Sequence, residues 1–226
     1  MLGISKEVDS NQDGVHPRLV ELVKRHMAHP WQGAIATHTE EAFAALAAWR
    51  RHTDPAAPLI LDSGCGTARS SVALAKQHPG HLVVGVDQSA DRLARAERRF
   101  PQRPANLLLL RAEAADLWRL MAAEQWQLAK HYVLYPNPWP KAAHVARRWH
   151  GHPAWRELLQ LGGLLHCRSN WQIYVQEMAV ALNAVGLRAE VVPLQINMAG
   201  AHEALTDFEE KYTLSGHSLW QLTAKL

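Results

Sequence analysis

Five acidic and small residues lie where short apolar segments of the sequence end, and together they are suited to holding a nucleoside. They are Asp62, Gly64, Gly66, Asp87 and Glu113. Glycine lets the backbone turn tightly and lets a ligand approach it closely. A carboxylate after a second strand accepts hydrogen bonds from both ribose hydroxyls. The position of Asp87 fits that role, and Glu113 is placed to meet an adenine.

The loop after the first apolar segment distinguishes between two nucleoside cofactors. A dinucleotide site carries GxGxxG and sets a pyrophosphate on a helix N-terminus. Here Ala68 and Arg69 follow Gly66, so that motif is incomplete. S-adenosylmethionine carries no phosphate, and its sites combine an acid with x-G-x-G, which the run D-S-G-C-G matches better. We therefore expect S-adenosylmethionine, and the alternative is an ordinary turn with solvated acids.

A stiff proline-rich segment is the other candidate for chemistry. It runs from Tyr135 to Lys141 and contains Asn137 and Trp139 between prolines. Proline fixes φ, and a rigid arm is what holds a substrate base against a methyl donor. Residues 137–156 contain four Lys or Arg and no acid. The segment therefore predicts a substrate arm with a basic, RNA-binding continuation, and a solvated basic loop is the alternative.

Strands and helices alternate along the chain, which predicts an α/β fold. Expected strands lie in residues 59–62, 81–87, 106–117, 131–141, 162–170, 187–196 and 217–226, and expected helices in 16–28, 39–51, from 69 onward, 90–100 and 171–185. This order favours a mostly parallel sheet with helices on both faces, and ligands beyond the carboxyl ends of its strands. We expect a flexible arm over residues 1–14 and a single domain over 15–226.

The composition excludes several classes of protein. The chain has 226 residues, is 48% hydrophobic and carries a formal charge of +3, which suits a globular protein. No apolar run approaches the roughly 18 residues of a membrane helix, and the polar N-terminus is not a secretory signal. Two cysteines, Cys65 and Cys167, without a CxxC motif favour a reducing cytoplasm and argue against a cysteine zinc site.

Two other kinds of chemistry are not expected. The sequence has no GxSxG motif, which argues against a hydrolase. His144, His150 and His152 lack a nearby carboxylate or cysteine in sequence, so we expect them to add charge to a basic loop rather than to bind a metal. A monomer is favoured.

Several longer motifs resemble the bacterial tRNA (guanine-N7)-methyltransferase family. That family has PDPWPKxxHxxRR where this chain has Pro136 to Arg148, and Thr-Asp-Trp where this chain has Ser169 to Trp171. It has TxFE at Thr206 to Glu209, followed by Gly-His at Gly216 and His217. The resemblance spans from about residue 15 to the end. It implies a Rossmann-like class I methyltransferase fold, S-adenosylmethionine as cofactor and a tRNA guanine as substrate.

The resemblance also implies roles for individual residues. Asp62, Asp87 and Glu113 match the family's acidic cofactor contacts. Its substrate contacts match Lys141, Asn170, Thr206 and Glu209, and its RNA-binding loop matches His144, Arg147 and Arg148. Asn137 stands at a site aspartate of the family and is our candidate catalytic residue, expected to orient the base.

Substitutions at family positions change the expected chemistry. Asn137 and Asn170 replace the family's two site aspartates, Ala68 replaces a glycine, and Ala142, Ala143 and Ala146 replace basic residues. Guanine N7 has a free lone pair, so its methylation needs no proton removed, but the product is cationic and a carboxylate would stabilise it. Asparagine offers one acceptor, one donor group and no charge. We expect a lower rate or a different substrate edge, and weaker RNA binding.

Two alternatives to tRNA guanine-N7 methylation stay open. Asn137-Pro138-Trp139 partly matches the N-P-P-aromatic motif of enzymes that methylate exocyclic amines, which points to a different base edge or a small molecule. A non-catalytic RNA-binding protein is the other alternative. It would retain RNA without being stabilised by S-adenosylmethionine.

Overall fold

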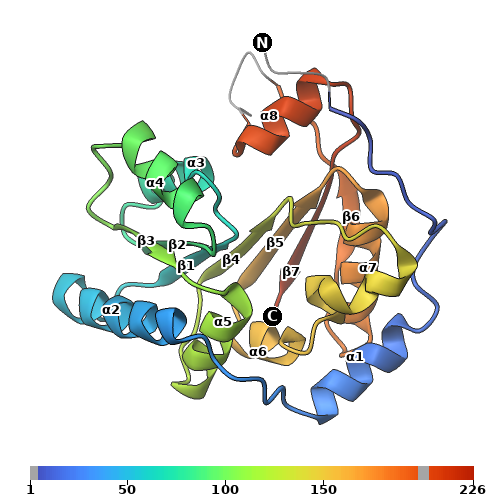
Figure 1. Ribbon diagram of the computed structural model, residues 1–226, viewed down its shortest axis with the longest axis horizontal. Helices are drawn as coiled ribbons and strands as arrows, with labels where there is room; N and C mark the ends of the chain where they lie inside the picture. The colour runs from blue at the N-terminus through green and yellow to red at the C-terminus, as the bar shows by residue number, and fades with distance from the viewer. Residues whose placement is uncertain (1–4, 198–203) are drawn as a thin grey trace. The chain divides into compact units, whose positions relative to one another are not determined.

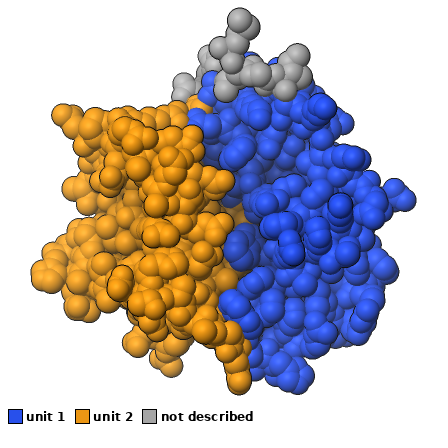
Figure 2. Space-filling model, in the orientation of Figure 1, with its two compact units in different colours: residues 1–31, 134–156, 165–226 blue, residues 32–133, 157–164 orange. Residues whose placement is uncertain are grey.

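The computed structural model describes residues 5–197 and 204–226. The chain divides into two compact units, which Figure 2 colours separately. Unit 1 comprises residues 1–31, 134–156 and 165–226, and unit 2 comprises residues 32–133 and 157–164. Seven strands are ordered β3-β2-β1-β4-β5-β7-β6 in the sheet. The predicted cofactor residues all belong to unit 2, and the predicted substrate residues all belong to unit 1.

Unit 2 is built on parallel strands covered by helices on both faces. Its elements are α2 (Thr37–Thr53), β1 (Leu59–Ser63), α3 (Arg69–Gln77), β2 (Leu82–Asp87), α4 (Ala90–Arg99), β3 (Leu107–Arg111), α5 (Ala114–Ala123) and β4 (Lys130–Leu134), with most of α6 (Trp155–Gln160). β1 pairs in parallel with β2 and β4, and β2 with β3. In Figure 1, α3 and α4 lie on one side of these strands, and α2 and α5 lie on the other. This two-sided cover explains why every residue of β1 and β2 is buried.

Unit 1 combines strands with the proline-rich segment and the C-terminal motifs. Its elements are α1 (Leu19–Ala28), the short 3₁₀ helices η1 (Ala142–Arg147) and η2 (Trp149–Gly151), β5 (Leu164–Ser169), α7 (Gln172–Asn183), β6 (Glu190–Pro193), α8 (Asp207–Leu214) and β7 (Trp220–Lys225). β6 and β7 are antiparallel. α1 packs against α7 and η2, beside α7 in Figure 1. The buried residues of α1, Leu19, Val23 and His26, recur at helical spacing on that packed face.

The structure confirms the predicted α/β fold and, in the described part of the chain, adds three α-helices and two 3₁₀ helices that we did not predict. The segment 106–117 contains β3, but its second half begins α5 rather than ending in a turn. α6 and α8 are each eight residues or shorter, so the apolar period that identifies a helix hardly repeats in them. Among the described residues, no helix is long and apolar enough to span a membrane.

The described part of the predicted N-terminal arm, residues 5–14, is tied to the rest of unit 1. It has no helix or strand, as expected. However, Ser10 Oγ donates to the carbonyl oxygen of Pro140 at 2.7 Å, and Asn11 Oδ1 accepts from the backbone N–H of Ala142 at 3.1 Å. The arm therefore braces the proline-rich segment instead of lying free. Residues 1–4 of the arm lie outside the described residues.

Candidate functional site

The loop after β1 presents its backbone to open space. The backbone N–H groups of Gly64 and Cys65 both donate to the carbonyl oxygen of Val86, at 2.8 and 2.9 Å, which ties the loop to the end of β2. Gly64 and Gly66 have φ of +84° and +58°, the left-handed region that glycine occupies without strain. A Cβ at either position would meet nothing within 4 Å. The glycines therefore serve the loop conformation, and the space above them suits a ligand.

Ala68 ends this loop in a conformation that favours glycine. It is the N-cap of α3, and its φ of 62° and ψ of 17° are left-handed. A residue with a side chain costs roughly 1–2 kcal/mol in this region. The family that the chain resembles has glycine here, so the substitution places backbone strain directly beside the loop.

Asp62 links the end of β1 to the first turn of α3 and so holds the loop between them. Its Oδ2 accepts hydrogen bonds from the hydroxyls of Ser70 and Ser71, at 2.6 and 2.7 Å, in the first turn of α3. Asp62 is 1% exposed, and burial raises the pKa of its carboxyl although the two hydroxyls oppose that shift. Oδ1 has no hydrogen-bond partner among the described residues. The sequence analysis missed the two serines. A signal was present, because hydroxyl side chains at the start of a helix, shortly after an acid, can hydrogen-bond to that acid.

Asp87, at the end of β2, closes the other side of the loop. Its Oδ2 accepts from the backbone N–H of Gly66 at 3.0 Å and from Arg92 Nη1 at 3.4 Å, and its Oδ1 accepts from the N–H of Ser89 at 2.8 Å. An ionised carboxylate has about four lone-pair positions, so these three contacts leave room for another donor. The contact with Arg92, whose side chain is half exposed, is the longest of the three.

Glu113 caps α5 near the end of β2. It is the N-cap residue, half-buried, and its backbone N–H donates to Thr39 Oγ1 at 3.0 Å. With the amide of Gln88 turned so that its nitrogen faces the carboxylate, that nitrogen donates to both Glu113 oxygens, at 3.0 and 3.2 Å. Gln88 directly follows Asp87, so the structure brings the predicted acids to one end of the strands, as expected.

A buried polar cluster lies behind this loop. Trp118 Nε1 donates to Ser63 Oγ at 3.0 Å, and the same hydroxyl lies 2.9 Å from His131 Nε2. His131 is wholly buried, and burial lowers its pKa to about 3, so the ring is neutral. The neighbouring Cys65 thiol has its pKa raised well above the usual value, first by burial and then by Asp62. A thiol that stays protonated is a poor nucleophile, so Cys65 fills space in the turn.

In unit 1, an arginine and a histidine of the proline-rich segment's continuation contact the ring of Trp139. The guanidinium of Arg147 lies 4.7 Å from the centre of the Trp139 ring, and the His144 ring meets it edge-on at 5.7 Å. Asn137 Oδ1 accepts from the backbone N–H of Trp139 at 3.3 Å. Asn137, Lys141 and Arg147 are exposed, and His144 is half-buried. The structure thus brings these predicted substrate residues onto one surface.

Arg148 contradicts its predicted role in RNA binding. It is wholly buried, and its Nη1 pairs with Glu177 Oε2 at 2.5 Å. Its other nitrogens donate to the carbonyl oxygens of Trp139 and Lys141 and to the amide oxygen of Gln12. A phosphate cannot reach a guanidinium that is wholly buried. Arg148 therefore holds the proline-rich segment in place, although its neighbour Arg147 is exposed.

Glu177 is the centre of this buried network and was missed by the sequence analysis. Its carboxylate also accepts from Gln12 Nε2 at 2.6 Å and the backbone N–H of His16 at 2.9 Å, and His150 Nε2 lies 2.8 Å away. Burial raises the pKa of Glu177, but the bonds and charges of His150 and Arg148 outweigh it and bring the pKa to about 2.

Within the described ranges, no group of three or more His, Cys, Asp or Glu is arranged to hold a metal ion.

Thr206 and Glu209 likewise act on the protein rather than facing solvent. Thr206 is the N-cap of α8, and its hydroxyl accepts from the N–H of Glu209 at 2.9 Å, as Ser and Thr do at helix starts. Glu209 is wholly buried and accepts from the Tyr135 hydroxyl at 3.0 Å and from Arg168 at 2.9 Å. We therefore correct the prediction that Thr206 and Glu209 contact the substrate. These two residues anchor α8 beside the start of the proline-rich segment.

Asn170 hydrogen-bonds to His217, and the geometry of the pair fixes the tautomer of that histidine. His217 Nε2 lies 3.0 Å from the carbonyl oxygen of Ser5, which only accepts, so this nitrogen carries the hydrogen. His217 Nδ1 of the neutral ring is then an acceptor, and the amide nitrogen of Asn170 donates to it at 3.2 Å. An aspartate at position 170 could not make this bond to a neutral ring.

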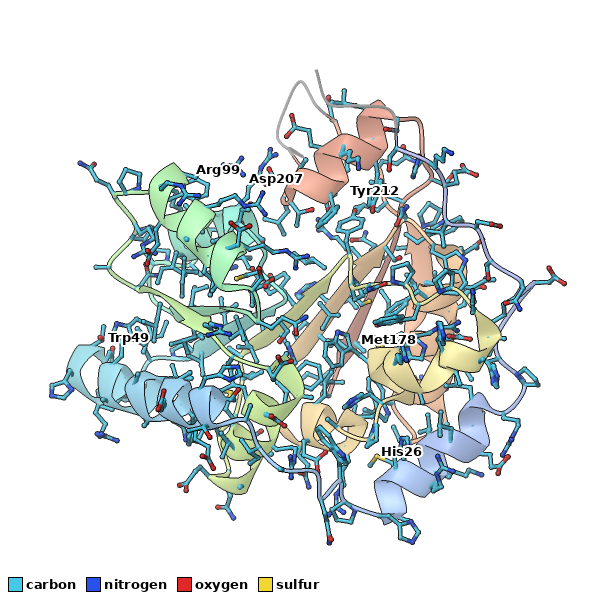
Figure 3. All side chains as sticks on the ribbon, in the orientation of Figure 1. His26, Trp49, Arg99, Met178, Asp207 and Tyr212 are labelled. Atoms are coloured by element: carbon cyan, nitrogen blue, oxygen red, sulfur yellow. The ribbon has the colours of Figure 1, made fainter. Side chains whose placement is uncertain are left out.

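Stacked aromatic rings extend from this pair along α8. The His217 ring stacks on Tyr212, with centroids 5.1 Å apart, and Tyr212 in turn stacks on Phe208 at 5.9 Å. Figure 3 labels Tyr212 on α8. Asn170 therefore belongs to the same cluster as the TxFE helix, far from it in sequence.

Comparison with known proteins assigns the chain to a family. A family described as "Putative methyltransferase" matches residues 56–222. A tRNA (guanine-N(7)-)-methyltransferase of Bordetella parapertussis is 30% identical over 75% of this chain and 67% of that protein. The protein of the same name from Geobacillus kaustophilus is 26% identical over 78% of this chain and 82% of its own length.

Solved structures agree on the fold. The 16S rRNA methyltransferase KamB has a TM-score of 0.59 at 18% identity, covering 86% of this chain and 95% of its own. A mutant of the 16S rRNA (adenine(1408)-N(1))-methyltransferase from Catenulisporales acidiphilia, solved with its cosubstrate, has a TM-score of 0.56 at 20% identity, covering 79% and 90%. Together with the α/β architecture and the glycine loop between two acids, these similarities show that the chain belongs to the methyltransferase family, as a diverged relative of the tRNA (guanine-N7)-methyltransferases.

Proposed function

We propose that this protein transfers a methyl group from S-adenosylmethionine to N7 of a guanine in tRNA. The observation that carries the proposal is the open loop with two left-handed glycines, held between Asp62 and Asp87, in a chain of this family. The exposed basic surface around Trp139 supports an RNA substrate. A tRNA substrate also implies a cytoplasmic location.

The residues of unit 2 fit S-adenosylmethionine. The backbone at Gly64 and Gly66 has open space above it, which suits the amino-acid part of a ligand without phosphate. Asp87 would accept the ribose hydroxyls, one of them in place of the 3.4 Å contact with Arg92. Oδ1 of Asp62 would accept a donor of the ligand, and Glu113 would lie near the adenine.

The reaction requires little proton transfer by the protein. When bound, S-adenosylmethionine supplies an electrophilic methyl carbon on a sulfonium. That methyl group would pass to the lone pair of guanine N7, and the electron pair of the carbon–sulfur bond would stay on sulfur. Because N7 carries no hydrogen, no side chain has to act as a base. The part left to Asn137 is to orient the guanine through its amide, beside the ring of Trp139.

The change from aspartate to Asn137 makes this chemistry slower than it would be with a carboxylate. The guanine becomes cationic as the bond forms, and a nearby carboxylate stabilises that charge. Asn137 has no charge, and its Oδ1 already accepts from the backbone of Trp139. We therefore propose a weak but specific activity, not a loss of the activity.

The experiment is methyl transfer from S-adenosylmethionine labelled in its methyl group to bulk tRNA at low salt. N7-methylguanosine is identified by its chemistry, since reduction with borohydride followed by aniline breaks the chain there. Asp87→Asn is the control, because it weakens the ribose contact and leaves the RNA surface of unit 1 unchanged. Label at N7 supports the proposal. Label on an exocyclic amine or a small molecule, or RNA binding without label, contradicts it and supports an alternative.

A further inference from the structure

A hollow lies between α1 and η1 in unit 1, beside the exposed basic surface. Arg18, Glu21 and Arg25 line it from α1, and Val145 and Ala146 line it from η1. The elements are packed closely at its base, where a side chain at Gly151 would collide with the carbonyl oxygen of Val145 and touch Leu22. The hollow is therefore a fixed feature of the packing.

The positive charge of the hollow comes from one wall only. Ala146 contributes only a methyl group to the η1 wall, while two guanidinium groups face the hollow from α1 and its N-cap residue, Arg18. A basic side chain at position 146 would therefore enter the same hollow from the opposite wall.

The arginines of the hollow are available for a ligand. No carboxylate pairs with Arg25 within the described ranges of the chain, and its Nη2 lies 3.5 Å from His26, labelled in Figure 3. Arg18 pairs with Glu21 at 3.3 Å, but both side chains are largely exposed, so this pair is weak. Arg25 also interacts electrostatically with Glu21, but no close ion pair joins them among the described residues, so the Arg25 guanidinium keeps N–H donors for an anion.

We propose that the α1–η1 hollow binds a backbone phosphate of the RNA substrate through Arg25 and Arg18. This inference rests on the proposed function for the identity of the anion. The guanidinium group offers parallel N–H donors that match two phosphate oxygens. Arg147 directly follows Ala146, so an RNA strand that meets the surface around Trp139 continues into the hollow. Helix α1 is therefore part of the RNA-binding surface.

The test measures the binding of bulk tRNA, by fluorescence anisotropy at several salt concentrations, for matched variants. Arg25→Ala is expected to weaken binding about three- to tenfold at low salt and to lower the salt slope by about one. Arg51→Ala removes the same charge from the exposed end of α2, in unit 2, and is expected to change binding less than about twofold. Glu21→Gln is expected to tighten binding, because it removes a negative charge from the hollow.

A rescue distinguishes this site from a general charge effect. Ala146→Arg in the Arg25→Ala background returns a guanidinium to the same hollow from the other wall, so it is expected to restore most of the lost affinity. Equal losses in Arg25→Ala and Arg51→Ala, or a loss that Ala146→Arg does not restore, overturn the proposal. An absence of tRNA binding also overturns it. If the variants behave as expected but no methyl group is transferred, the phosphate site stands and the proposed function fails.

Discussion

The loop of unit 2 and the proline-rich segment of unit 1 have diverged to different degrees. The loop keeps Gly64, Gly66 and the flanking Asp62 and Asp87, with a further glycine replaced by Ala68, and each aspartate accepts hydrogen bonds from adjoining segments. The proline-rich segment has lost a carboxylate at Asn137 and basic groups at its alanines, all exposed or half-buried. Its buried supports, Arg148 and Glu177, remain charged and paired. The changes in this segment therefore lie at its surface, whereas the buried network beneath that surface is intact.

The largest expected effect is on the free energy of unfolding. Two adjacent arginines, one buried and one exposed, show how much the buried network contributes compared with the surface. Arg148→Ala leaves Glu177 as a buried charge without the guanidinium that pairs with it, and we expect it to lower the free energy of unfolding by about 3–5 kcal/mol. Arg147→Ala removes an exposed cation–π contact and is expected to cost less than about 1 kcal/mol. Urea unfolding of both variants measures the difference. Similar losses would show that the buried network does not hold unit 1 together.

Acid should weaken unit 2 through His131 before Glu177 of unit 1 is protonated. The folded-state pKa of His131 is about 3, below its unfolded value near 6.5, so its contribution is complete above pH 6.5 and falls as the pH drops toward 3. By pH 5 the expected loss is about 2 kcal/mol. Glu177, with a pKa of about 2, loses its contribution only below about pH 4.5.

The measurement is the free energy of unfolding between pH 7 and pH 5 for the native protein and for His131→Asn. The variant lacks the titrating ring, so between pH 7 and pH 5 its free energy of unfolding should fall by about 2 kcal/mol less than that of the native protein. His150 is also buried with a lowered pKa and is present in both proteins, so its effect cancels in the comparison. Parallel curves would contradict a neutral, buried His131.

The smallest effect concerns the match between Asn170 and His217. Asn170→Asp sets a carboxylate against Nδ1 of a ring whose hydrogen is on Nε2, so two acceptors face each other. We expect a loss of about 1 kcal/mol in the free energy of unfolding at pH 8, since the pair is half-buried. Thermal unfolding measures it. An Asn170→Asp variant as stable as the native protein would contradict the assigned tautomer.

Sequence reasoning predicted the loop after β1 because the residues that form it are close together in the chain. Asp62, Gly64 and Gly66 lie in one strand-turn unit, so their types and spacing were enough to predict the loop. The same reasoning failed for Arg148, because a motif gives the order of residues and not the direction of side chains. Its partner Glu177 lies 29 residues away and Gln12 lies 136 residues away, separations at which no pattern is visible.

The TxFE motif shows the same limit from another side. The sequence placed Thr206 and Glu209 at the substrate, whereas the structure uses them to start α8 and to hold Tyr135 and Arg168. A threonine followed by a glutamate three residues later is also the signature of a helix start. That second meaning of the motif was present in the sequence and would have predicted α8.

The most direct test of the account is the single-turnover rate of methyl transfer to tRNA by the native protein and by Asn137→Asp, both saturated with S-adenosylmethionine and tRNA. If the framework is intact and only the surface has changed, the native protein methylates guanine N7 slowly. Asn137→Asp then raises that rate by about tenfold, because the carboxylate stabilises the cationic product, while cofactor affinity stays the same. No N7 methylation by either protein, or an equal rate in both, would contradict the account.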